Sequence, residues 1–98
     1  MSVEMVIELP DRRTAQTVQH VLASYQVRLR ASIQRTRCRL ASFEERYAVS
    51  TSRFLAEMSA EDLQGGDLEY VEWAGEAKLL EGLELELREL GNARQCRP

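Results

Sequence analysis

Hydrophobic and polar positions follow the spacing of an amphipathic helix along two long stretches of the chain. In the first, mostly apolar residues recur every three or four positions, which places them on one face of a helix; they are Val18, Leu22, Tyr25, Leu29, Ile33, Thr36, Leu40, Phe43 and Tyr47. In the second, the same spacing joins Tyr70, Trp73, Ala77, Leu80, Leu83, Leu87 and Leu90. The pattern predicts a long helix over 11–47 and another over 67–90.

Between these helices, residues 48–66 predict a hinge that contains a short helix. Ala48 to Ser52 favour caps and turns over helix interior, and Ser50 is the expected N-cap. The Gly65–Gly66 pair permits a positive φ and a sharp reversal. We therefore expect an all-α antiparallel hairpin whose turn is held by an aromatic cluster. The candidate core residues of the hinge are Phe43, Tyr47, Phe54, Leu63, Tyr70 and Trp73.

A short β-strand is predicted over 3–9, where apolar residues alternate with Glu4, Val6 and Glu8 until Pro10 ends the run. No second strand pattern exists in the sequence, and a lone strand has unpaired backbone groups at both edges. We expect it to pair with another chain. A frayed terminus with the same pattern is the alternative, and residues 91–98 are expected to form a tail.

The predicted long helix is too long to bury its stripe in a monomer of 98 residues with one shorter helix opposite. This favours a single domain that binds itself or another protein. The candidate partner-binding residues are Val3, Met5, Ile7 and Leu9 of the strand and Val18, Leu22, Tyr25 and Leu29 of the helix.

The two halves of the chain carry opposite charge. Residues 1–53 hold nine arginines against five acids, or +4, whereas residues 54–98 hold four bases against eleven acids, or −7. Oppositely charged helices that pack together explain this division. The alternative is a basic half that contacts nucleic acid; the strand argues against this contact, because Glu4 and Glu8 would repel phosphates. Nucleic-acid binding by the arginine-rich helix remains a minor alternative.

The sequence holds no recognisable catalytic or metal-binding arrangement. His20 is the single histidine, Cys38 and Cys96 are far apart, and Gly65–Gly66 lacks the Lys and Ser or Thr of a phosphate loop. We expect a non-enzyme without metal or cofactor. The sequence also lacks an apolar run of membrane-spanning length and a signal-peptide pattern, so we expect a cytoplasmic protein without a membrane segment.

Residues 40–80 carry a motif that resembles the small antitoxin-like proteins of prokaryotic toxin–antitoxin pairs, including the TumA-like group. The matching residues are Leu40, Phe43, Glu44, Arg46, Tyr47, Ser50, Thr51, Phe54, Asp62, Leu63, Gly66, Asp67, Tyr70, Glu72, Trp73 and Ala74. The chain departs from that pattern at Ser52–Arg53, where acids are usual, and at Gly65, which is an insertion. The resemblance implies a protein that neutralises a small toxin, often a ribonuclease. A structural coiled-coil homo-oligomer is the alternative.

Overall fold

The computed structural model describes residues 12–95 and is all-helical there, which confirms the all-α part of the predicted fold class. Its elements are α1 (Arg12–Tyr47), α2 (Thr51–Glu57), a 3₁₀ turn η1 (Ala60–Asp62) and α3 (Gly66–Gln95). The strand predicted over 3–9 lies outside the described residues, as does Cys96. Their structure is therefore not part of this description.

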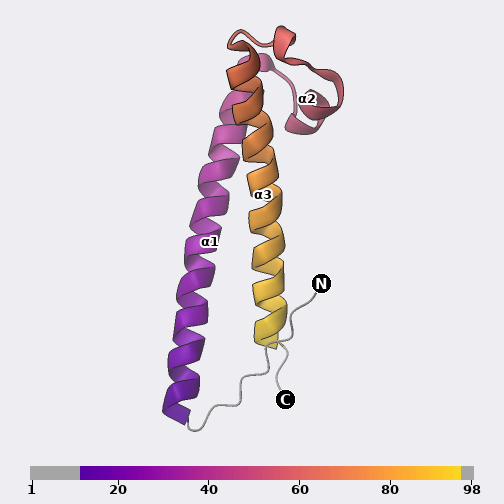
Figure 1. Cartoon of the computed structure of the whole chain (residues 1–98). Coiled ribbons are helices and arrows are strands. Elements are labelled where there is room, and N and C mark those ends of the chain that lie inside the picture. Colours follow the sequence, from indigo (N-terminus) through magenta and orange to yellow (C-terminus); the bar gives the residue numbers. More distant parts are fainter. Residues whose placement is uncertain (1–11, 96–98) are drawn as a thin grey trace.

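The two long helices lie side by side and run in opposite directions, with α2 and η1 at one end (Figure 1). The chain measures 59 × 23 × 19 Å. Along most of this length the rod is a single layer of two helices, and α2 and η1 add to its width only at the hinge end (Figure 1). Each long helix therefore has a single long neighbour in its own chain.

Local backbone chemistry ends α1 and begins α2. Ala48 has a positive φ of 55°, a conformation common just beyond a helix C-terminus. Ser50 caps α2 as expected, because its hydroxyl accepts a hydrogen bond from the Arg53 amide at 3.2 Å. The Glu44 carboxylate accepts another from the Thr51 amide at 2.7 Å. Side chains of α1 and the hinge thus satisfy two of the orphan amides of α2.

The reversal into α3 depends on the two adjacent glycines. Gly66 has a φ of +61°, which favours glycine. A Cβ on Gly65 would lie 2.8 Å from the Cβ of Glu69, so the first turn of α3 would have to shift. Before this turn, the Asp62 carboxylate accepts a hydrogen bond from the Ser59 amide at 2.8 Å, in the arrangement expected of a capping box.

The end of α3 differs from the prediction. The sequence predicts a stop at Gly91, but α3 continues to Gln95. A glycine within a helix costs only about 1 kcal/mol of stability relative to alanine. The surroundings of Gly91 are also open, since nothing lies within 4 Å of a Cβ built there. Gly91 therefore lies within the helix.

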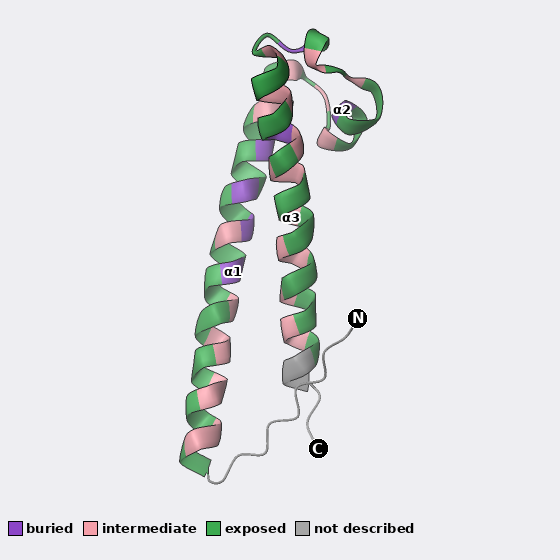
Figure 2. Cartoon of the chain, in the orientation of Figure 1, coloured by how far each residue is buried: buried purple, intermediate pink, exposed green. Residues whose placement is uncertain are grey.

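The core is concentrated at the hinge end (Figure 2). We use the name clasp for the cluster of Leu40, Phe43, Tyr47, Phe54, Leu63, Tyr70 and Trp73, in which four side chains are buried and the aromatic partners are half-buried. From the clasp, burial continues along α1 through Thr36 and Ile33 to Leu29. Among the described residues, α1 has no buried side chain before Leu29, and α3 has none after Trp73.

Candidate protein-binding surface

The clasp is organised around the indole ring of Trp73, which is 0% exposed. Phe54 stacks on it with ring centroids 3.8 Å apart, and Phe43 does so at 5.2 Å. Tyr47 adds a third stacked ring at 5.7 Å. Because these rings come from α1, α2 and α3, Trp73 joins all three helices, and offset aromatic stacking adds to the free energy gained by burial alone.

Hydrogen bonds fix the polar atoms of the clasp. The indole Nε1 of Trp73 donates to Thr51 Oγ1 at 3.1 Å. The Tyr47 hydroxyl donates to Glu69 and accepts from the Gln64 amide at 3.0 Å. The pKa of Glu69 lies below its ordinary value, chiefly because of the bond from Tyr47, with further contributions from the Gly65 amide and Arg46. The clasp thus stabilises the ionised carboxylate.

The structure brings the six predicted hinge-core residues together in the clasp. Phe54, Leu63 and Trp73 are buried, and Phe43, Tyr47 and Tyr70 pack against them. This cluster also explains the motif at 40–80, because its apolar members are core residues.

The predicted partner-binding residues divide into three groups. Val3, Met5, Ile7 and Leu9 lie outside the described residues. Leu29 is 5% exposed and packs within its own chain. Val18 and Leu22 are half-buried, and Tyr25 is 38% exposed. The surface that remains available therefore lies in the half of the hairpin away from the clasp.

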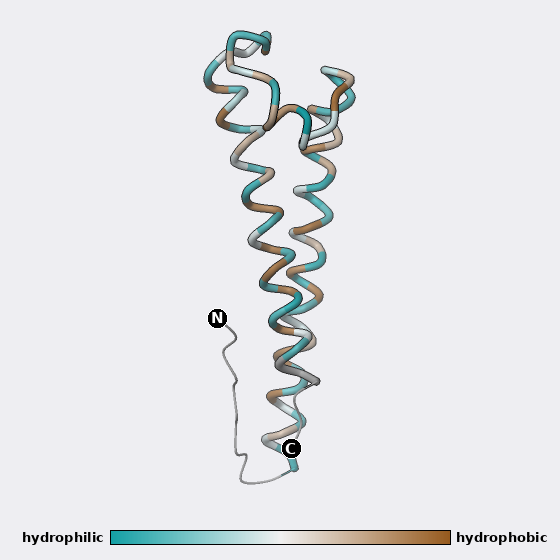
Figure 3. Tube along the Cα trace, turned by 90° about the vertical axis from the view of Figure 1, so that its right-hand side faces the viewer, coloured by the Kyte–Doolittle hydropathy of each residue, from teal (hydrophilic) through white to brown (hydrophobic). Residues whose placement is uncertain are grey.

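We use the name open half for residues 12–28 of α1 and 81–92 of α3. Hydrophobic positions continue along both helices into this half (Figure 3). Yet Leu83, Leu87 and Leu90 are only half-buried there, and Val21 is 56% exposed. The apolar stripe thus extends along the helices beyond the buried core.

The two sides of the hairpin differ. On one side, Tyr25 donates to Glu86, Arg39 pairs with Glu76 at 3.1 Å, and Arg46 pairs with Glu69 at 2.5 Å. We call this side the ladder flank. With about 100° of rotation per residue, Arg37 and Arg30 lie on the other side of the buried stripe of α1.

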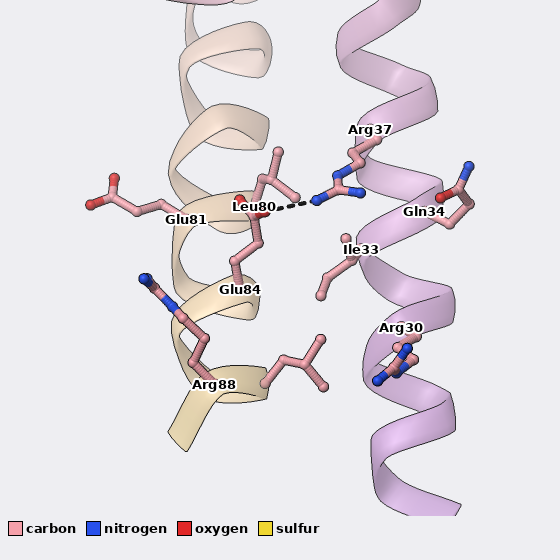
Figure 4. A pocket seen from close by; sticks show the side chains of 9 residues that line it. Arg30, Ile33, Gln34, Arg37, Leu80, Glu81, Glu84 and Arg88 are labelled. Atoms are coloured by element: carbon pink, nitrogen blue, oxygen red, sulfur yellow. Dashed lines mark hydrogen bonds and ion pairs between the residues drawn. The ribbon is translucent and has the colours of Figure 1, made fainter. Parts of the chain in front are cut away.

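That other side, the groove flank, contains a cavity of about 660 Å³ between α1 and α3. Ile33, Leu80 and Leu87 line its apolar part, and Arg37 crosses it to Glu84 at 2.8 Å (Figure 4). Arg30, Glu81 and Arg88 also line it, and they form no ion pair within the described residues. The groove flank is therefore the less tightly closed side.

Reactive side chains do not gather at either flank. Over residues 12–92, no group of three or more His, Cys, Asp or Glu side chains is arranged to hold a metal ion. Cys38 and His20 are both exposed on α1. None of the helices in the described part combines the length and apolar character needed to cross a bilayer. The two flanks of the hairpin instead present apolar side chains and paired charges.

Comparison with known proteins does not identify a relative. No protein-family model matches the chain, and no curated protein or solved structure does so either.

Sequence reasoning missed the ladder flank. The signal was present in the spacing of Arg28, Arg35, Arg39 and Arg46, which are seven, four and seven positions apart and so share one side of α1. Considered only as scattered charges, these arginines do not indicate a surface. The structure shows two of them reaching glutamates of α3.

Proposed function

We propose that the protein is a non-catalytic binding module that acts by forming a complex with another protein, as an antitoxin does with its toxin. The observation that carries this proposal is the apolar stripe of the open half, which the described residues leave half covered. Apolar side chains that recur along one face of a helix pair, with polar residues around them, are typical of a protein interface.

The antitoxin part of the proposal rests on the motif at 40–80. Because its apolar residues build the clasp, the motif supports a shared hairpin design and leaves partner contacts to the open half. The residues of α3 from Gly66 to Gln95 include eight acids and three bases, which suits a small basic toxin such as a ribonuclease. We place the protein in the cytoplasm, and we propose that the 3–9 segment pairs as a strand with a partner or a second copy.

Co-expression with the product of the neighbouring gene tests this function. We expect the two proteins to co-purify at a fixed ratio and the chain to restore growth that the neighbour inhibits. Val18→Glu in the open half should weaken both effects. Leu55→Glu, which changes an exposed residue of α2, is the matched control and should leave them intact.

A neighbour that neither inhibits growth nor binds the chain would contradict the antitoxin proposal. Nucleic-acid binding is the less favoured function, since Arg37, Arg39 and Arg46 already contact glutamates of α3. If it did occur, the affinity would fall steeply with added salt. A salt-sensitive complex with DNA or RNA would therefore replace the present proposal.

A further inference from the structure

We infer that two copies of this chain associate through the ladder flank as a parallel homodimer, with α1 of each copy against α3 of the other. This association goes beyond the binding of a foreign partner and does not depend on it. It follows from the order of residue types along the flank, which makes the surface complementary to itself.

On α1, the ladder flank is a row of residues separated by three, four or seven positions, the spacing of helices packed in coiled-coil bundles. The first part of this row is apolar and contains Val18, Val21 and Tyr25. The part nearer the clasp is basic and contains Arg28, Arg35, Arg39 and Arg46. All four arginines are exposed.

On α3, the same flank is acidic near the clasp and largely apolar beyond it. Glu69, Glu72 and Glu76 precede Leu79, Leu83, Glu86 and Leu90, again at steps of three and four. Leu79 is 47% exposed. The order of residue types on α3 is thus the counterpart of the order on α1.

This order selects one symmetry. A two-fold axis along the rod places α1 of one copy beside α3 of the other at the same level, so arginines face glutamates and Tyr25 faces Leu90. An axis across the rod places α1 against α1, where the basic part of one copy would cover the apolar part of the other. Isologous interfaces require a self-complementary surface, and only the first arrangement provides one here.

Charges that the single chain leaves unpaired fit the same arrangement. Because α1 and α3 are antiparallel, the residue numbers of a pair that meets across the hairpin have a nearly constant sum. This sum is 111 for Tyr25 with Glu86 and 121 for Arg37 with Glu84. If the two copies lie at the same level along the rod, the same sum applies to pairs between copies. Arg28 then lies near Glu86 of the other copy, and Arg39 lies near Glu72 of the other copy. Arg28, Arg35 and Glu72 form no ion pair among the described residues.

The available area is sufficient for a stable dimer. One face of the rod measures 59 by 23 Å, which exceeds the roughly 800 Å² that each partner contributes to a standard interface. The resulting four-helix bundle would cover the apolar row of the open half, which a hairpin alone does not.

Charge reversal tests the dimer and its orientation together. The first variant carries Arg28→Glu and Arg39→Glu, and the second carries Glu72→Arg and Glu86→Arg. In sedimentation equilibrium, we expect the unmodified chain to have twice the mass of one chain and each variant alone to have the mass of one. An equimolar mixture of the two variants should recover the dimer, because both α1–α3 contacts between copies then pair opposite charges.

The matched control carries Arg30→Glu and Glu81→Arg on the groove flank, and it should remain dimeric. Circular dichroism establishes that every variant keeps its helices. An unmodified chain that stays monomeric throughout would overturn the inference. So would a mixture that fails to associate, or a control that dissociates while the ladder-flank variants remain dimeric.

Discussion

Trp73 is the residue on which the clasp depends most. Its ring extends from α3, stacks on side chains of α1 and α2, and is fully buried. We expect Trp73→Ala to lower the free energy of unfolding by about 3–5 kcal/mol, because it removes a large buried ring and leaves a cavity. Urea denaturation followed by circular dichroism measures this loss. A loss under about 1 kcal/mol, the size typical of surface changes, would show that Trp73 is not a core residue.

The Tyr47–Glu69 hydrogen bond predicts a pH dependence. Its effect is to lower the pKa of Glu69 in the folded chain, so the stabilisation is present above the ordinary value of 4.5 and is lost as the pH falls through the folded pKa. Tyr47→Phe removes the donor. The difference in Tm between the unmodified chain and Tyr47→Phe should be largest near neutral pH and shrink on acidification below about pH 4.5.

A difference in Tm that stays constant between neutral and acidic pH would contradict this role. The loss would then come from the Gln64 amide, which also bonds the Tyr47 hydroxyl and does not titrate. The Tyr47 ring stack is retained in the phenylalanine variant, so the comparison isolates the hydroxyl.

At the scale of the elements, Gly75 and Gly82 lie within α3 without a structural need for glycine. A Cβ built at either position meets nothing within 4 Å, so no backbone of the described residues approaches closely. We expect Gly75→Ala and Gly82→Ala each to raise the free energy of unfolding by up to about 1 kcal/mol, since alanine favours the helix. Thermal melts of the two variants measure the gain, and a lowered Tm would contradict it.

The helices themselves were predictable because periodic apolar residues extend over many turns. The start of α2 was also predictable, since Ser50 is a capping residue before a short apolar helix. The end of α3 was not, because Gly91 is both a frequent stop signal and a tolerable interior residue. Local sequence does not decide between these two roles when the flanking residues continue the helix.

The clasp could be anticipated because its rings lie close together in the sequence and recur at helical spacing. The ladder flank could not, because its contacts join residues 23 to 61 positions apart. Their pairing depends on the register between α1 and α3, which Trp73 and Phe43 set by packing. The opposite net charges of residues 1–53 and 54–98 indicated that the two halves of the chain attract each other. They did not indicate which side of the helices carries the charges.

At the scale of the whole molecule, the arrangement of the two long helices in a single layer determines where side chains are buried. A rod two helices wide gives each helix one buried side, and the clasp concentrates that burial at one end. Stability should therefore decrease from the clasp toward the open half, since local stability follows buried apolar contacts. We therefore propose that a companion chain covers the open half and adds buried contacts there.

Hydrogen exchange measured by mass spectrometry across a range of protein concentrations tests this account most directly. We predict that amides of Leu40–Tyr47 and Tyr70–Leu80 exchange slowly at every concentration. Amides of 14–26 should exchange fast in dilute protein and become protected as the concentration rises or a partner is added. Equal protection of both ends of the rod in dilute protein, unchanged by concentration or partner, would contradict the claim that the chain needs a companion.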